Sequence, residues 1–266
     1  MTIALAVSAS DGLIMATDTE ESADGFWKVE QGKMRLGHNA DVATRYERAY
    51  AVAAAGSAGL CDALMEKIVD VLAAAPPVQP SAASITAVKR EIETVATEFH
   101  NRHILPLAVS GHPANVRAIV AAQFNGRSQI WTTELGTIAD SGVFAAIGIG
   151  DAHARVVLDQ LWRSNVKDVY DAIFLGAYAV HQAKEFVAGC GKFTNIAFMR
   201  RGDFTRVPQE ITNGLDVLFA RLSREAEPPL LKYAFHTADS ITAGTRVLQQ
   251  IRAEFAKARK RLRSLE

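Results

Sequence analysis

The stretch TIALAVSASDGLIMATD, residues 2–18, decides the fold because it contains two apolar runs joined by a turn. The runs Ile3–Val7 and Leu13–Ala16 have the length and composition of buried strands. Between them, Ser10-Asp11-Gly12 is typical of a tight turn. We therefore expect a β-hairpin in which the numbers of cross-strand partners sum to about 20 to 23.

This hairpin sets Thr2 beside a carboxylate. Its register places Thr2 opposite the segment from Asp18 to Glu21, and directly opposed residues have Cβ atoms about 4.5–5.5 Å apart. Asp18 is the best placed, because it follows the apolar strand directly. If Met1 is removed, Thr2 carries a free α-amine beside its hydroxyl. One residue then provides both a nucleophile and a base.

The composition argues against several classes of protein. In 266 residues, 29 Lys and Arg balance 29 Asp and Glu, so no net charge favours a nucleic acid or a membrane surface. No apolar run reaches the roughly 18 residues of a membrane span, and no basic region precedes the first run as in a signal peptide. Cys61 and Cys190 do not suggest a disulfide framework. We expect a cytoplasmic protein with no cofactor and no metal.

Strand-like and helix-like patterns follow one another in blocks. After the first strands come helical patterns over 60–71 and 85–99, then strands, then helical patterns over 156–162 and 167–187, then strands again. Blocks of this kind favour antiparallel sheets covered by helix pairs over alternating parallel units. We expect an α+β fold, namely a four-layer αββα sandwich of two antiparallel sheets flanked by helix pairs.

The pattern changes near Val207. Residues 1–207 contain the predicted sandwich, whereas residues 208–266 contain helical patterns interrupted at Pro228-Pro229. The last helix ends in a basic cluster, as suits the C-terminal end of a helix dipole. We expect 208–266 to be a helical C-terminal extension that packs on the main domain or on a neighbouring subunit.

Four short motifs, taken in order, resemble a proteasome-type β subunit of the N-terminal nucleophile (Ntn) hydrolase superfamily. They are Thr2 with its strand, L-I-M-A-T-D ending at Asp18, G-K-M containing Lys33, and A-A-G-S-A-G around Gly56. The sequence looks most like the bacterial members without a propeptide. The resemblance implies the αββα fold, a homo-oligomeric ring and a threonine endopeptidase that acts on peptides or unfolded proteins, with an ATPase unfoldase as a further partner.

The resemblance also implies catalytic roles for four residues. The Thr2 hydroxyl attacks a peptide carbonyl, and the Thr2 amine, with an ordinary pKa of about 7.7–8.0, acts as the general base. The Lys33 ammonium disfavours protonation of that amine, and Asp18 holds Lys33 charged and oriented. The amide of Gly56 donates to the oxyanion. By residue type alone, Lys28 competes with Lys33.

Two places depart from the family's pattern. Active members carry a Ser between two glycines before the third helix, where this sequence has Ile149. They carry an Asp and a Ser at the positions of Val187 and Cys190, with Glu185 the nearest carboxylate here. Those residues support the terminal amine in active subunits. Two alternatives to a peptidase therefore stay open: a proteasome-like scaffold or binding compartment without proteolysis, and a small-molecule amidase of the same fold.

Overall fold

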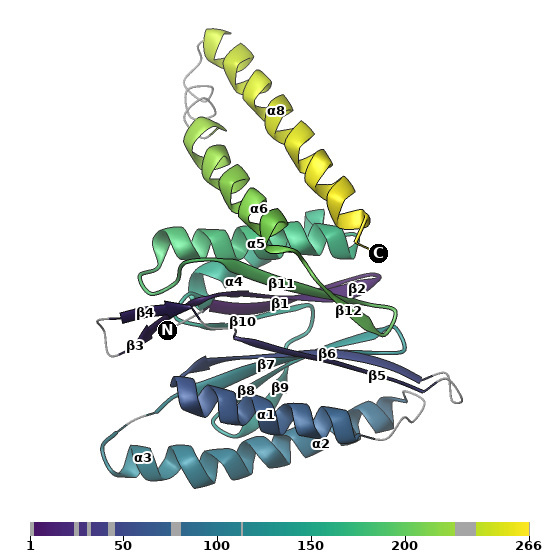
Figure 1. Ribbon diagram of the computed structural model, residues 1–266, viewed down its shortest axis with the longest axis vertical. Coiled ribbons are helices and arrows are strands. Elements are labelled where there is room, and N and C mark those ends of the chain that lie inside the picture. The colour runs from purple at the N-terminus through teal and green to yellow at the C-terminus, as the bar shows by residue number, and fades with distance from the viewer. Residues whose placement is uncertain are drawn as a thin grey trace. The chain divides into compact units, whose positions relative to one another are not determined.

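The computed structural model describes residues 3–23, 27–30, 33–41, 46–75, 81–112, 114–226 and 238–265. Thr2 lies outside these residues. Two five-stranded antiparallel sheets lie face to face at the centre of the first of two compact units, which ends at Arg206 (Figure 1). The first sheet has the order β10 (Phe144–Gly148), β1 (Ile3–Ala9), β2 (Gly12–Asp18), β11 (Thr194–Arg200) and β12 (Asp203–Arg206).

The second sheet and the helices complete four layers. The second sheet has the order β5 (Met34–Asp41), β6 (Tyr46–Gly56), β7 (Val116–Phe124), β8 (Arg127–Glu134) and β9 (Thr137–Asp140). A separate two-stranded ribbon pairs β3 (Glu20–Ala23) with β4 (Trp27–Glu30). The helices of this unit are α1 (Ala58–Ala74), α2 (Ala82–Phe99), a π-helical turn (His100–Ile104), α3 (Leu105–Val109), α4 (Asp151–Asn165) and α5 (Val169–Phe186).

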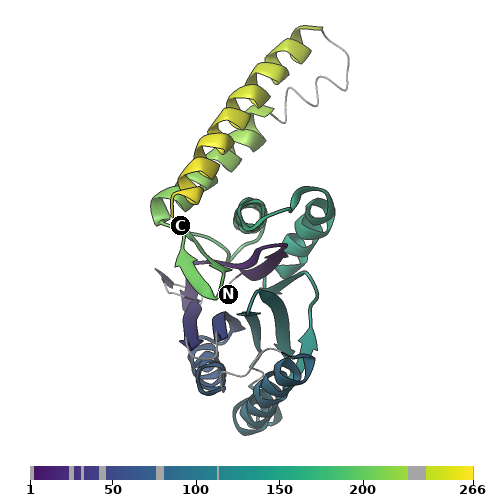
Figure 2. The ribbon, with the colours of Figure 1, turned by 90° about the vertical axis from the view of Figure 1, so that its right-hand side faces the viewer.

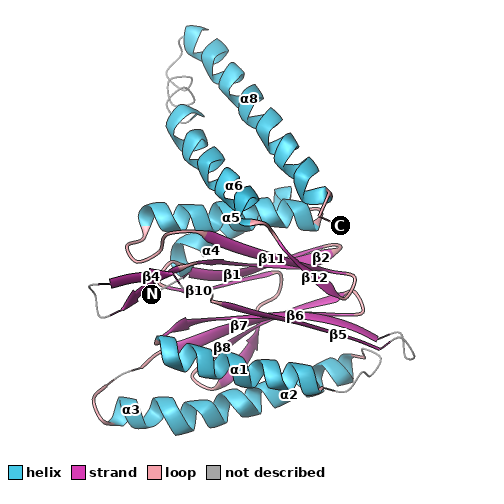
Figure 3. Cartoon of the chain, in the orientation of Figure 1, coloured by secondary structure: helices cyan, strands magenta, loops and turns pink. Residues whose placement is uncertain are grey.

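The helices cover the two sheets in pairs, as the sequence predicted. Helices α1 and α2 lie on the outer face of the second sheet, and α4 and α5 lie on the outer face of the first (Figures 1 and 3). Turned by 90°, the molecule shows α1 and α2 on one side of the paired sheets (Figure 2). The predicted four-layer αββα sandwich is confirmed. No helix of the described residues is long and apolar enough to cross a membrane.

The first hairpin has the predicted register. The pairs between β1 and β2 run from Ala4↔Thr17 to Ala9↔Gly12, so their numbers sum to 21. On its other edge β1 pairs with β10, where Ile3 lies opposite Gly148. Strand β1 is therefore an interior strand. Its apolar run is continuous rather than alternating because both faces are buried, one under α5 and the other against the second sheet.

Small side chains fill the space between the two sheets. On β6, alternate residues point to opposite faces: Tyr50, Val52 and Ala54 pack toward the helices, whereas the intervening positions face the first sheet. The inter-sheet core is rich in alanine, which lets the sheets approach closely. Its members include Ala4, Ala6, Leu13, Met15, Ala49, Ala51, Ala53, Ala55, Ile119, Ala121, Ala145, Ile147, Ala197 and Met199.

Helix α5 fits tightly on the first sheet. A capping box begins it, in which the Asp168 and Asp171 side chains each accept from the other's backbone N–H. Further along, a Cβ at Gly176 would lie 2.3 Å from Ile14 Cδ1, closer than non-bonded carbons can approach. The glycine therefore allows α5 to lie directly against β2, the strand that ends at Asp18.

The chain divides into two compact units, Met1–Arg206 and Val207–Glu266. The second consists of α6 (Gln209–Arg221), a π-helical turn (Leu222–Ala226) and α8 (Ala238–Arg263). Helices α6 and α8 pack through Phe219 and Phe255, whose ring centroids are 5.7 Å apart, and an Arg221–Glu254 ion pair at 2.7 Å flanks them. Packing of this extension on the main domain or on a neighbouring subunit stays a prediction.

Candidate active site

Asp18 is the centre of the polar cluster at the end of β2. Its side chain is fully buried, and its Oδ1 accepts from the backbone N–H of Ile3 at 3.1 Å and from Lys33 Nζ at 2.8 Å. Its Oδ2 accepts from the backbone N–H of Gly191 at 3.0 Å. A buried carboxylate is stable only when hydrogen bonds and a counter-charge replace its lost hydration. These three donors hold Asp18 in one orientation, directly beside the first described residue.

Lys33 reaches this cluster from the other sheet. It precedes β5 directly, and its side chain is only 10% exposed. Besides its ion pair with Asp18, Lys33 Nζ donates to the backbone carbonyl of Glu20. The contact between Asp18 and Lys33 that the family resemblance implied is present, and it crosses from one sheet to the other.

The segment before β11 closes the cluster on a third side. It contains Gly191, which binds Asp18, and Cys190, which is buried. The pKa of the Cys190 thiol is raised to about 12, mainly by burial; the negative charges of Asp18 and Glu20 also raise it, and the Lys33 ammonium lowers it. Cys190 is therefore a protonated thiol next to the Asp18–Lys33 pair rather than a nucleophile.

Gly56 ends β6 in a conformation that only glycine adopts readily. Its φ is +135°, and a Cβ there would lie 1.8 Å from the carbonyl oxygen of Asn115. The following residue, Ser57, donates its backbone N–H to the same carbonyl at 3.2 Å. Strand β6 therefore leads into α1 through a residue that has no side chain. The backbone amide of Gly56 is not covered by side-chain atoms of its own, which suits an amide that contacts a ligand.

A pocket of about 400 Å³ opens at this glycine. Residues from three elements line it: the end of β6, the start of β7 and the turn after β10. Arg117 is the charged residue among them, and its Nη1 lies 3.0 Å from Asp151 Oδ2, at the first turn of α4. The lining residues are Ala55, Gly56, Ser57, Asn115, Arg117, Gly148 and Ile149.

The pocket and the Asp18 cluster lie next to each other across the pairing of β1 with β10. Gly148 lines the pocket, and it is the cross-strand partner of Ile3, whose N–H binds Asp18. Directly opposed Cα atoms in an antiparallel pair lie about 4.5–5.5 Å apart. Of the four predicted catalytic residues, Asp18 and Lys33 are thus in contact, Gly56 lines the pocket beside Gly148, and Thr2 lies outside the described residues.

Two of the positions that depart from the family's pattern, Ile149 and Cys190, belong to this site. Ile149 is 46% exposed and lines the pocket, and Val187 directly follows α5. Ala54, next to Ala55 on β6, is buried in the core under α1 and α2.

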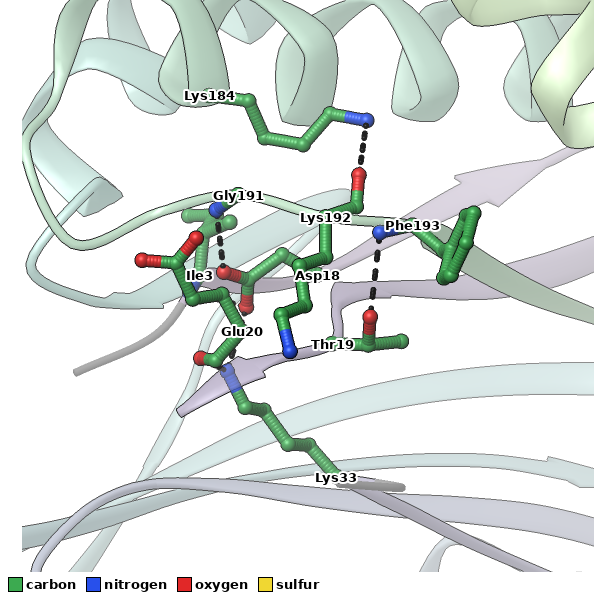
Figure 4. Close-up of polar contacts among 9 residues, drawn as sticks. All are labelled: Ile3, Asp18, Thr19, Glu20, Lys33, Lys184, Gly191, Lys192 and Phe193. Carbon is green, nitrogen blue, oxygen red and sulfur yellow. Dashed lines mark hydrogen bonds and ion pairs between the residues drawn. The ribbon is translucent and has the colours of Figure 1, made fainter. Parts of the chain in front are cut away.

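Sequence reasoning missed Glu20 and the donor Gly191 (Figure 4). Only the position of Glu20 two residues after Asp18 hinted at its presence here. Within the described residues, no group of three or more His, Cys, Asp and Glu side chains is placed to hold a metal ion.

No family model matches the sequence, and no curated protein matches it either. Solved structures do match. A mutant of Anbu from Hyphomicrobium sp. strain MC1 is 18% identical with a TM-score of 0.66, and the match covers 86% of this chain and 97% of that one. Anbu from Yersinia bercovieri, described as an ancestral beta-subunit, is 14% identical with a TM-score of 0.65, covering 89% of this chain and 98% of that one.

A third structure shows a helical assembly of the Anbu complex from Pseudomonas aeruginosa. It is 16% identical with a TM-score of 0.63, and the match covers 87% of this chain and 95% of that one. At such low identities the likeness concerns the fold and does not assign an activity. The chain therefore has the fold of Anbu, and this fold is the four-layer αββα sandwich that the order of strand and helix blocks predicted.

Proposed function

We propose that this protein is a threonine-type peptidase whose nucleophile is Thr2, exposed by removal of Met1. The observation that carries the proposal is the hydrogen bond from the Ile3 N–H to Asp18 Oδ1, because Asp18 is also paired with Lys33 at 2.8 Å. A buried carboxylate–ammonium pair is expensive to maintain in a fold. Its presence directly beside the residue that follows Thr2 favours a catalytic role over a structural one.

Covalent geometry places limits on where the Thr2 amine can be. Three bonds of about 1.46, 1.52 and 1.33 Å join the nitrogen of one residue to that of the next, so the Thr2 nitrogen lies within about 4.3 Å of Ile3 N in any conformation. Ile3 N is itself 3.1 Å from Asp18 Oδ1. A free Thr2 amine would therefore be covalently tethered to a residue whose own N–H binds Asp18.

In the proposed reaction, the Thr2 hydroxyl oxygen attacks a carbonyl carbon while its proton passes to the Thr2 amine. The positive charge of Lys33 lowers the pKa of both groups, which favours the alkoxide and keeps the amine unprotonated before attack. The oxyanion of the tetrahedral intermediate accepts from the Gly56 N–H. Collapse expels the leaving amine, which takes the proton from Thr2, and water then hydrolyses the ester in the same way.

The pocket beside Gly56 suits an extended peptide that approaches along the end of β6. Asn115 and Arg117 provide polar groups there, and Ile149 provides an apolar surface. We further propose that several copies form a ring or a related homo-oligomeric assembly. This rests on the shared fold, because the Anbu complex of Pseudomonas aeruginosa forms a helical assembly. An ATPase unfoldase as partner is a further proposal from the family resemblance.

A direct test combines mass spectrometry with a covalent inhibitor. Intact mass should show the loss of Met1, and a peptide epoxyketone or β-lactone should add one molecule per chain at Thr2. Thr2→Ala should abolish labelling, whereas Thr2→Ser, which keeps a hydroxyl beside the amine, should retain it at a reduced rate. Labelling of Thr2→Ala equal to that of the wild type would sink the proposal.

A second candidate is a proteasome-like scaffold or binding compartment without proteolysis. The observation that favours it is the exposed apolar side chain of Ile149 where active family members carry a Ser. A protein that loses Met1 and assembles, yet takes up no label and cleaves no peptide, would support this candidate. Labelling by β-lactones combined with hydrolysis of small amides but not of peptides would instead support an amidase.

A further inference from the structure

Glu20 is a buried carboxylate in the Asp18 cluster that the resemblance does not assign to catalysis. It is the first residue of β3 and is only 4% exposed. Glutamate is rarely buried to this degree unless a charged or polar group compensates it. Its position close to the Asp18–Lys33 ion pair favours a role for Glu20 in the candidate site.

A contact with Gly191 shows where this carboxylate lies. A Cβ at Gly191 would be 2.2 Å from Glu20 Oε2, so this oxygen lies directly against the Gly191 backbone. The N–H of Gly191 donates to Asp18 Oδ2 at 3.0 Å. The two carboxylates therefore flank the same residue, and Figure 4 shows Glu20 turned toward Gly191 on the side where Ile3 lies. In addition, the Glu20 carbonyl accepts from Lys33 Nζ.

Charged and titratable groups lie on the elements around Glu20. Asp18 and Lys33 belong to the ion pair, and Cys190 is a thiol held protonated by burial. From the side of α5, Lys184 Nζ donates to the Lys192 carbonyl at 3.3 Å and to Thr194 Oγ1 at 2.8 Å. Lys192 is exposed. Two buried carboxylates this close raise the free energy of keeping both ionised, and a further cation among them lowers it.

We infer that Glu20 is the positioning residue for the Thr2 amine, and that its carboxylate accepts a hydrogen bond from the Thr2 ammonium. The inference rests on the proposed function, in which the amine becomes an ammonium when it takes the hydroxyl proton. In the family's pattern an Asp at the position of Val187 supports the amine. Glu185, the nearest carboxylate in the sequence, is exposed on α5, whereas Glu20 is buried within the cluster.

The test measures the pKa of the Thr2 amine itself. The full-length protein is acetylated with acetic anhydride across a pH series, and the acetylated N-terminal peptide is quantified by mass spectrometry. Because an anion stabilises an ammonium, Glu20→Gln should lower this pKa by about 1 unit or more, the range expected for a charge about 4–6 Å away. Glu20→Asp, which keeps the charge, should shift it less. Glu185→Gln is the matched control and should leave it unchanged.

The outcomes separate this inference from the proposed function. A free Thr2 whose amine pKa is the same in the wild type and in Glu20→Gln overturns the role of Glu20 alone. A larger shift in Glu185→Gln than in Glu20→Gln also overturns it. Retention of Met1 overturns both proposals, and intact mass detects it. Circular dichroism shows whether Glu20→Gln folds. If it does not, the pKa of the Thr2 amine is compared between Glu20→Asp and the wild type. Equal pKa values in these two proteins, with a pKa lowered by about 1 unit in Glu185→Gln, count against Glu20.

Discussion

The candidate site has two sides that differ in their polar contacts: a strand side, at the ends of β1 and β2, and a turn side, between β10 and α4. On the strand side, at the ends of β1 and β2, Asp18 is fully buried and accepts three hydrogen bonds, one of them from Lys33. On the turn side, between β10 and α4, the apolar side chain of Ile149 is exposed to the pocket. The strand side has the buried ion pair to which the proposed function assigns the activation of Thr2, and the turn side lacks the hydroxyl that the family's pattern has there.

This difference indicates which part of the site is built into the fold. The strand-side contacts connect both sheets, so removing one of them disturbs packing as well as chemistry. The turn-side residues lie at a surface and can change with little effect on the fold. Mutations on the two sides therefore test whether the reactivity of Thr2 needs only the strand side.

Lys33→Ala should have the largest effect. It removes the cation paired with the buried Asp18, which should lower the free energy of unfolding by about 3–5 kcal/mol and slow epoxyketone labelling of Thr2 at least about 100-fold. Urea titration and the labelling rate by intact mass measure the two effects. Lys28→Ala, at the competing lysine of the sequence, is the control. Equal effects of the two substitutions would mean that the strand-side pair does not matter.

Gly56→Ala should come next. The added Cβ would meet the Asn115 carbonyl oxygen at 1.8 Å, in a backbone conformation that L residues rarely adopt. We expect a loss of stability of about 1–3 kcal/mol and slower labelling, since the bare backbone lines the pocket. Gly59→Ala in α1 is the matched control, because nothing lies within 4 Å of its Cβ position. Thermal unfolding of both variants makes the comparison, and a Gly56→Ala protein as stable as Gly59→Ala contradicts it.

A smaller effect concerns pH and the thiol of Cys190. Burial raises its pKa from 9.0 to about 12 in the folded protein. Above pH 9 the unfolded chain binds fewer protons than the folded one at this thiol, so stability must fall as pH rises. By pH 10 the wild type should lose about 1 kcal/mol more than Cys190→Ala. Urea titrations at pH 7, 9 and 10 check this, with Cys61→Ala as the second cysteine variant; parallel curves for wild type and Cys190→Ala would refute it.

Ile149→Ser should have the smallest effect on the fold. The side chain is 46% exposed, so we expect the free energy of unfolding to change by less than about 1 kcal/mol. The new hydroxyl restores the family's residue near the amine and should increase the labelling rate a few-fold. A labelling rate that falls while stability is kept would show that the apolar surface of Ile149 is itself required in the pocket.

Much of this arrangement could be predicted from the sequence because it is local. The hairpin from Ile3 to Asp18 has continuous apolar runs and a Ser-Asp-Gly turn, which predicted cross-strand partners that sum to about 20 to 23; the observed sum is 21. The order of strand and helix blocks then led to four layers. The glycine at position 56 was recognisable because a strand ran directly into a helix there.

The rest depends on contacts between distant segments. Gly191 reaches Asp18 across 173 residues, and no periodicity links these positions. In the sequence, Glu20 is one more polar residue after a strand. Local composition does not distinguish a buried carboxylate from an exposed one. The pocket at Gly56 also needs Arg117 and Ile149, which come from separate strands and turns. Such juxtapositions follow from the stacking of the two sheets rather than from any short motif.

The central claim is that Thr2 is a free N-terminal nucleophile activated by the Asp18–Lys33 pair. Intact mass spectrometry of the full-length protein, before and after treatment with a peptide epoxyketone, tests it most directly. The account predicts a chain that lacks Met1 and gains one inhibitor molecule, which peptide mapping locates at Thr2 and which Lys33→Ala takes up at least about 100-fold more slowly. A chain that retains Met1, or one that lacks Met1 and gains no inhibitor, would contradict it.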